Sequence, residues 1–189
     1  MVPINSDEAE KDGILAAAKL MAVSARTAPK GRGLDSIKTL ILHEREELEK
    51  LATAMEEVSR EDPERLDFFQ RNANDVRKST AVLLIGVTGE PKRVESPLNC
   101  GACGIDCPGM AKTKKRDQGM MRGPMCHMQS IDLGIALGSA VKTASELNID
   151  NRMMYSIGAA SRRIKLMDAD FVVGIPLAVT GKNPYFPIR

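Results

Sequence analysis

The stretch from Asn99 to Met128 reads NCGACGIDCPGMAKTKKRDQGMMRGPMCHM and holds all four cysteines of the 189-residue chain. Cys100, Cys103 and Cys107 form a close group in the sequence, and Cys126 follows after a loop. Four thiolates are a complete tetrahedral ligand set for a metal. The spacing therefore predicts that the rest of the chain is organised around a metal site.

The residues around the first three cysteines favour an iron–sulfur cluster. Gly101, Ala102 and Gly104 are small enough to let backbone N–H groups approach cluster sulfurs, and Pro108 follows the third cysteine, as in many iron–sulfur runs. Three residues separate the second and third cysteines, whereas the usual bacterial run has two, so the number of irons is inferred rather than read from the spacing. We predict one [4Fe-4S] cluster ligated by Cys100, Cys103, Cys107 and Cys126.

Two other interpretations of the cysteines stay open. Structural zinc uses four cysteines, or three and a histidine, and His127 adjoins Cys126; however, zinc ribbons usually carry two Cys-x-x-Cys pairs and this chain has one. The third interpretation is a disulfide or a set of unconnected thiols. Because no secretory signal is recognisable, we expect a reducing, cytoplasmic location, which disfavours disulfides.

Length and composition restrict the class of protein. A chain of 189 residues, 43% of them hydrophobic, is long enough to bury a sizeable core. We expect a single domain over 1–189, into which a cysteine-rich segment over 95–128 is inserted. The net charge of +2 is too small to indicate nucleic-acid binding, and no apolar run has the length of a membrane span. We therefore expect neither a nucleic acid nor a membrane as partner.

Periodic segments on both sides of the cysteines predict a mixture of helices and strands. Apolar residues at helical spacing predict helices over 6–27, 44–61, 63–78, 130–147 and 159–167. Continuous apolar runs predict strands over 36–42, 81–87, 153–157 and 171–179. The segment from Pro91 to Gln129 has no evident period, which is rare in a compact domain unless something such as a metal orders it.

A basic run lies between the third and fourth cysteines. It contains five basic residues and one acidic residue, namely Lys112, Lys114, Lys115, Arg116, Arg122 and Asp117. One interpretation is a solvated loop; the other is a docking site for an acidic redox partner protein, because complementary charge speeds encounter. Single-stranded nucleic acid would require interleaved aromatic residues, and none are present there.

The segment Ser130–Leu147 is rich in small residues. Gly134 and Gly138 recur at helical spacing together with alanines, which allows another backbone to approach closely. The pattern indicates either a core helix or a helix at the interface of a homodimer.

Several segments together resemble a known scaffold. The sequence Ala25-Arg26-Thr27-Ala28-Pro29-Lys30-Gly31, the strand after it, the long Ala- and Gly-rich helix, the turn at Gly158 and the run from Ala169 to Leu177 are similar to the flavin-dependent nitroreductases. With its cysteines, the chain more closely resembles the uncharacterised ferredoxin-domain proteins built on that scaffold. The resemblance implies an α+β fold with a mixed sheet flanked by helices, an inserted cysteine-rich metal-binding loop, a homodimer, and FMN at the dimer interface.

The same resemblance implies roles for particular residues. The loop from Pro29 to Arg32 would contribute to the flavin pocket, Gly158 would face the flavin N5, and Lys182 or Arg189 would approach the phosphate. The cationic side chains expected near the FMN phosphate are Arg26, Lys30, Arg32, Lys182 and Arg189.

Two classes of function follow from these features. The first is an iron–sulfur redox protein, either an FMN-dependent oxidoreductase or an electron carrier. The second is a non-catalytic binding or assembly module with a structural zinc site. No residue pair forms a recognisable acid/base or nucleophile arrangement, so the sequence identifies neither catalytic residues nor a substrate.

Overall fold

The computed structural model of the chain describes residues 3–186. The helices are α1 (Ser6–Thr27), the 3-10 turn η1 (Gly31–Gly33), α2 (Arg45–Glu61), α3 (Pro63–Lys78), α4 (Cys107–Lys112), α5 (His127–Glu146) and α6 (Tyr155–Arg163). The strands are β1 (Ile37–Leu42), β2 (Ala81–Val87), β3 (Arg116–Asp117), β4 (Arg122–Gly123), β5 (Asp150–Asn151) and β6 (Phe171–Ala178). None of the helices in this range is long and apolar enough to cross a membrane.

The main sheet has the strand order β1-β2-β6-β5, and β2 in its interior is buried along its whole length. Ile37 pairs with Val87 and Val87 with Phe171, so these three residues mark one end of the sheet, which we call the cysteine end. Ala81 pairs with Leu177 at the opposite end. Each described pairing in this sheet is antiparallel, whereas a mixed sheet was expected. The helical hairpin of α2 and α3 brings the chain back beside β1, so that β2 runs antiparallel to β1.

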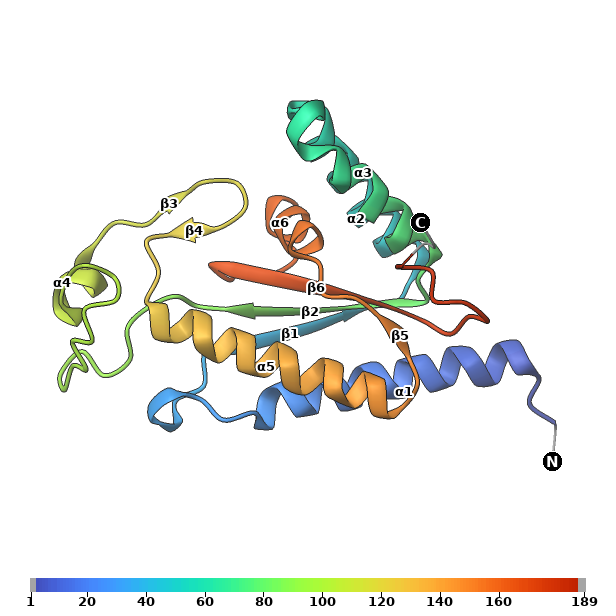
Figure 1. Cartoon of the computed structure of the whole chain (residues 1–189), viewed down its shortest axis with the longest axis horizontal. Helices are drawn as coiled ribbons and strands as arrows, with labels where there is room; N and C mark the ends of the chain where they lie inside the picture. The colour runs from blue at the N-terminus through green and yellow to red at the C-terminus, as the bar shows by residue number, and fades with distance from the viewer. Residues whose placement is uncertain (1–2, 187–189) are drawn as a thin grey trace.

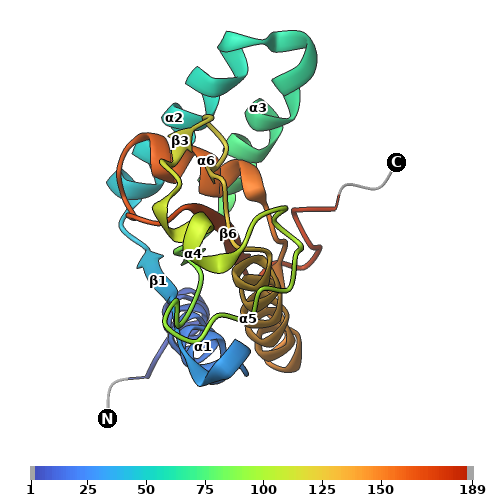
Figure 2. The same ribbon diagram turned by 90° about the vertical axis from the view of Figure 1, so that its left-hand side faces the viewer.

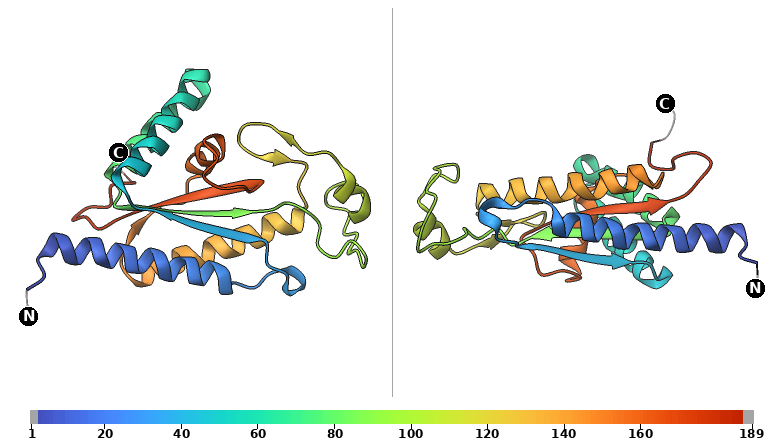
Figure 3. Two further views of the ribbon diagram at one scale, coloured as in Figure 1. Left: turned by 180° about the vertical axis from the view of Figure 1, so that it is seen from behind. Right: turned by 90° about the horizontal axis from the view of Figure 1, so that it is seen from below.

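Helices cover both faces of this sheet, as Figure 1 shows. Helices α1 and α5 pack on one face through a core that includes Met21, Leu83 and Leu133. Helices α2, α3 and α6 pack on the other face around Leu51, Phe69 and Leu84. Helices α1 and α5 run side by side beneath the sheet in Figure 3, joined by a 2.7 Å hydrogen bond between the Ser24 and Thr143 hydroxyls.

Local sequence explains where several helices begin. The Asn5 side chain caps α1 by accepting the Glu8 N–H at 2.9 Å. Asp62 caps α3 by accepting the Arg65 N–H at 3.2 Å, with Pro63 in the first turn, where its missing N–H is tolerated.

The predicted strand over 153–157 is wrong, and so is the predicted turn at Gly158. Only Met154 pairs with the sheet, through a bridge to Gly174, and α6 begins at Tyr155 and contains Gly158. A Cβ atom on Gly158 would lie 1.7 Å from the Val172 carbonyl oxygen. The glycine therefore permits α6 to pack directly against the backbone of β6.

The cysteine-rich segment lies at the cysteine end, beyond the end of β2 and the start of α5 (Figures 1 and 2). The segment predicted to lack periodicity contains the short helix α4 and the two-stranded hairpin of β3 and β4. We call residues 116–123 the β3–β4 hairpin.

Candidate metal centre and cofactor cavities

The structure brings three of the four cysteines to one cavity. Cys100, Cys107 and Cys126 line a cavity of about 40 Å³, together with the cationic residues Arg32 and Lys92. Cys103 is not part of this lining; it lies on the same loop and is half-buried. Residues separated by more than twenty positions in the sequence therefore meet at the cysteine end.

The loop that carries the first three cysteines turns sharply. Asn99, Gly101 and Gly104 all have positive φ angles, of 47°, 79° and 79°. The Cys107 N–H donates to Asn99 Oδ1 at 2.9 Å, and the Asn99 N–H donates to Cys107 Sγ at 3.4 Å. Glycine adopts these angles at little cost, so the small residues of the cysteine run make the turn possible.

Cys126 is held in place by the start of α5. It is the N-cap residue of this helix, it is buried, and its N–H donates to Gly89 O at 2.7 Å. One turn further, the Gln129 side chain donates to Glu90 O at 2.7 Å and accepts from the Ser36 hydroxyl at 2.5 Å. These bonds join α5 to the chain that leaves β2 and to the chain that enters β1.

A buried ion pair supports the same region, and sequence reasoning missed it. Lys92 Nζ donates to Asp132 Oδ2 at 2.5 Å, and their side chains are 11% and 3% exposed. Asp132 also accepts the Gly31 N–H at 2.8 Å. In the sequence, Asp132 is an acidic residue on an otherwise apolar helical face. That pattern does not identify Lys92, forty positions earlier, as its partner.

The donor set fits a thiolate-bound metal, although the four cysteines do not surround one position. In the range 3–186, no three His, Cys, Asp or Glu side chains stand close enough to hold one metal ion. Four cysteines nevertheless supply the complete thiolate set of a [4Fe-4S] cluster or of a zinc ion. Cys100 is exposed and Cys103 half-buried, on a glycine-rich loop, whereas Cys107 and Cys126 are buried.

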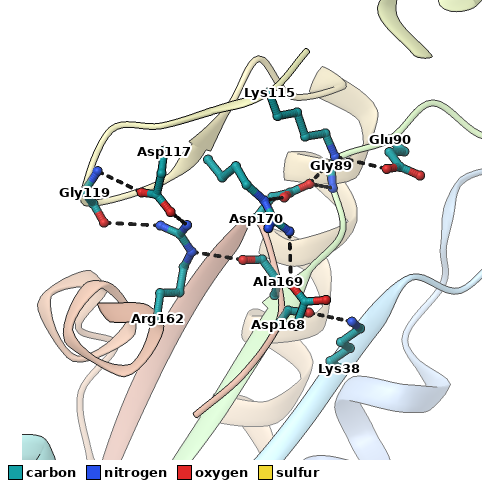
Figure 4. A network of polar contacts seen from close by, with 11 residues as sticks. Lys38, Gly89, Glu90, Lys115, Asp117, Gly119, Arg162, Asp168, Ala169 and Asp170 are labelled. Atoms are coloured by element: carbon teal, nitrogen blue, oxygen red, sulfur yellow. Dashed lines mark hydrogen bonds and ion pairs between the residues drawn. The ribbon is translucent and has the colours of Figure 1, made fainter. Parts of the chain in front are cut away.

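Part of the basic run belongs to an internal network around Asp170, drawn in Figure 4. This fully buried carboxylate accepts from Lys115 Nζ at 2.5 Å, from Arg122 Nε at 2.5 Å and from the Gly89 N–H at 2.7 Å. Burial by itself raises the pKa of Asp170, but these hydrogen bonds outweigh it and hold that pKa below its ordinary value. Lys115 and Arg122 are therefore not solvated loop charges.

The expected flavin-phosphate residues near η1 already have partners within the chain. Arg26 pairs with Asp35, and Arg32 donates to the Ser96 carbonyl. Lys30 Nζ donates to Ala25 O at 2.6 Å and Arg26 O at 2.5 Å, at the C-terminal end of α1, and burial lowers its pKa. Their contacts are to the protein's own carboxylate and carbonyl oxygens.

Within one chain, Lys182 does not join these residues. It follows β6 at the Ala81–Leu177 end of the sheet, whereas η1 precedes β1 at the cysteine end. The seven residues of β2 span the distance between the two ends, which corresponds to roughly 20 Å. Arg189 lies outside the described residues. The flavin roles assigned to Gly158 and to the five cationic residues stay predictions.

Two large cavities flank the aromatic pair Phe68 and Tyr155, whose ring centroids lie 5.7 Å apart. One cavity, of about 630 Å³, lies among α3, the start of α6 and the chain after β6. We call it the C-terminal cavity; its basic lining residues are Arg71, Lys78 and Arg152. The other, of about 670 Å³, lies among α2, α3, α6 and the β3–β4 hairpin, and we call it the hairpin cavity.

The sheet with helices on both faces is a nitroreductase-like α+β fold. A BluB-like flavoprotein from Clostridium difficile 630 matches 100% of this chain and 86% of its own chain, with TM-score 0.58 and 15% identity. A nitroreductase family protein from Clostridium novyi NT matches 95% and 77%, with TM-score 0.51 and 14% identity. The NADPH:FMN oxidoreductase from Vibrio harveyi complexed with NAD+ matches 100% and 65%, with TM-score 0.52 and 12% identity. At these identities the likeness shows the fold alone.

Sequence comparison identifies the family. An uncharacterized protein from Archaeoglobus fulgidus is 44% identical over 184 residues, which cover 97% of this chain and 96% of the relative. Residues 122–187 match the family described as uncharacterized protein containing a ferredoxin domain. The chain belongs to this family. The matched range includes Cys126, whereas Cys100, Cys103 and Cys107 precede it.

Proposed function

We propose that this protein is an iron–sulfur redox protein in which Cys100, Cys103, Cys107 and Cys126 hold one [4Fe-4S] cluster. The observation that carries the proposal is the single cavity lined by Cys126 and two cysteines of the 100–107 run. The family description, which names a ferredoxin domain, supports it. When bound, such a cluster accepts and donates single electrons. The fold buries Cys107 and Cys126 and so shields these two thiols from water.

Anaerobic purification followed by visible spectroscopy and by iron, sulfide and zinc analysis tests this proposal. Broad brown absorption with about four irons and four sulfides per chain is the result expected for a [4Fe-4S] cluster. A colourless protein with one zinc per chain would contradict it.

A structural zinc site is the second candidate, and the size of the cavity favours it. A volume of about 40 Å³ suits a single ion better than a cluster of several atoms. With zinc, the fold would be a binding or assembly module without turnover. The same metal analysis separates the two candidates.

We further propose that the scaffold binds FMN, and that the C-terminal cavity receives it. The names of the neighbours, which include a flavoprotein and an NADPH:FMN oxidoreductase, support a flavin. The cavity offers the Phe68 and Tyr155 rings for an aromatic ligand, and Lys78 and Arg152 for a phosphate. Its volume of about 630 Å³ lies in the range of small-molecule pockets.

Titration with FMN distinguishes this cavity from the loop near η1. We expect Lys78→Gln to weaken FMN binding roughly tenfold, because a charge-assisted contact to the phosphate is lost. Lys30→Gln is the matched control and should leave the affinity unchanged, since α1 carbonyls already occupy the Lys30 ammonium. Weaker binding in Lys30→Gln with unchanged binding in Lys78→Gln would place the phosphate at the 26–32 loop instead. If the unmodified protein shows no saturable binding at micromolar FMN, flavin is not part of the function.

We propose that the protein is a homodimer built on α5. Ile131 and Ile135 are exposed on this helix, and a Cβ atom added to Gly134 or Gly138 would meet nothing within 4 Å. Exposed glycines in a helix interior cost stability unless another backbone approaches them. A second copy of the same face would cover the glycines and both isoleucines.

Gly138→Leu should convert the dimer to a monomer without harming the fold. The Cβ atom of the new side chain meets nothing within 4 Å in the chain, and leucine has a better helix propensity, worth about 1 kcal/mol, but the side chain would fill the proposed interface. Light scattering measures the mass and thermal denaturation the stability. Gly13→Leu, at an equally open position in α1, should remain dimeric. A monomeric unmodified protein, or a dimeric Gly138→Leu variant, would refute the interface.

The exposed part of the basic run is proposed to dock an acidic redox partner. Lys112, Lys114 and Arg116 remain exposed, while Lys115 and Arg122 are held by Asp170. Electron-transfer rates with an acidic ferredoxin-like donor should fall as salt is raised. A salt-independent rate would argue against this surface.

A further inference from the structure

The hairpin cavity is lined by none of the cysteines, and it shares the Phe68 and Tyr155 rings with the C-terminal cavity. Its walls come from α2 and α3, from α6 and from the β3–β4 hairpin. Its volume of about 670 Å³ is sufficient for a small organic molecule.

Arg162 fixes the walls of this cavity relative to one another. Its side chain is only 6% exposed and extends from α6 toward the hairpin in Figure 4. It donates to Asp117 Oδ2 at 2.6 Å, to Gly119 O at 3.2 Å and to Ala169 O at 3.0 Å. These three contacts hold the hairpin against α6.

Apolar and aromatic side chains line the interior. Phe68 from α3 and Met120 from the β3–β4 hairpin line the cavity, and Tyr155, 46% exposed, adds a second ring. Aromatic rings attract flat aromatic ligands through stacking and edge contacts as well as through area burial. The lining therefore suits a molecule with an aromatic ring.

The charges around the cavity favour an anion. Four basic and two acidic side chains line it, namely Arg65, Arg162, Arg163, Lys165, Glu61 and Asp117. The three arginines pair with carboxylates: Arg65 with Asp62, Arg162 with Asp117, and Arg163 with Glu61. In the described part of the chain, Lys165 is the lining cation without a carboxylate partner.

The backbone at Lys165 ends α6. The Lys165 N–H donates to Arg162 O at 3.0 Å and the Leu166 N–H donates to Ser161 O at 2.9 Å, which is the Schellman motif that ends α6. Lys165 occupies the position of this motif where glycine is usual, with φ of 58°. A lysine there carries backbone strain that glycine would not.

We propose that the hairpin cavity binds an aromatic anion, with its ring against Phe68 and Tyr155 and its negative group at Lys165. The ligand class is an aromatic ring that bears a carboxylate or a similar single anionic group. Lys165 lines the hairpin cavity and not the C-terminal cavity, so the contact to the anion distinguishes this site from the proposed flavin site.

The test uses the full-length protein, purified anaerobically, with 2-naphthoate as probe and neutral 2-naphthamide as its uncharged counterpart. Probe fluorescence anisotropy reports binding, and the absence of tryptophan keeps the protein background low. Lys165→Gly should weaken 2-naphthoate binding roughly threefold to tenfold, leave 2-naphthamide binding unchanged, and keep or raise the melting temperature. Tyr155→Leu should weaken both probes.

Arg93→Gly is the matched control, since Arg93 is an exposed cation with φ of 52° that does not line this cavity. It should leave both affinities unchanged. Unchanged 2-naphthoate binding in Lys165→Gly, or an equal loss of both probes in that variant, would overturn the assignment of the anion. Full binding of both probes in Tyr155→Leu would place the ligand outside the cavity.

Discussion

Cys126→Ser should lose most of its iron and acid-labile sulfide when purified without oxygen, with a lower melting temperature. Cys126 is the one cysteine outside the 100–107 run, and it is buried at the N-cap of α5, where the Gly89 carbonyl fixes its backbone. Serine does not replace a soft thiolate ligand. Because metal affinity adds directly to folding free energy, loss of the ligand should appear in both measurements.

His127→Ala is the control for this experiment. His127 adjoins Cys126 at the start of α5, but it is exposed, whereas Cys126 lines the cavity shared with Cys100 and Cys107. The variant should therefore keep the iron and sulfide content of the unmodified protein. Normal cluster content in Cys126→Ser, with loss in His127→Ala, would make the histidine the fourth ligand.

Elements with strong local signals agree closely with the sequence prediction. The predicted helices over 44–61 and 63–78 correspond to α2 and α3, and the predicted strand over 81–87 corresponds to β2. The signals for these elements each lie within a few neighbouring residues: an apolar stripe on a charged helix, a proline in a first helical turn, and a continuous apolar run. The strand predicted over 153–157 failed because its backbone meets the sheet only at Met154.

The sequence predicted a group of cysteines, of which the structure brings three to one cavity, but it did not predict the surroundings of that cavity. Cysteine spacing alone indicated a metal, because all four thiols lie within one segment. The pairs Lys92–Asp132 and Lys115–Asp170 join residues 40 and 55 positions apart, and nothing local indicates them. Lys182 was assigned to the phosphate by the resemblance; within one chain the register of the sheet places it at the end opposite Lys30, and its flavin role stays a prediction.

Asp170→Asn should destabilise the protein by about 2–3 kcal/mol and release the β3–β4 hairpin. The carboxylate is fully buried and holds Lys115 and Arg122, so the neutral amide removes their buried counter-charge and leaves only the exposed carboxylates of Glu90 and Asp168. The cost falls below that of a completely buried pair because Arg122 is partly exposed and can turn to solvent. Denaturant unfolding measures the first effect, and hydrogen exchange of the amides over 116–123 the second.

The same carboxylate should control acid stability. Its pKa in the folded protein lies below the ordinary value, so it contributes stability that is fully present above about pH 4 and is lost as the pH falls through the folded pKa. Asp170→Asn should therefore show a weaker fall of stability below about pH 4 than the unmodified protein. Asp168→Asn is the matched control: Asp168 also contacts Arg122, at 3.1 Å, but it is exposed and should change stability by less than about 1 kcal/mol. Parallel pH curves for the unmodified protein and Asp170→Asn would mean that the hairpin is held by contacts other than this charge.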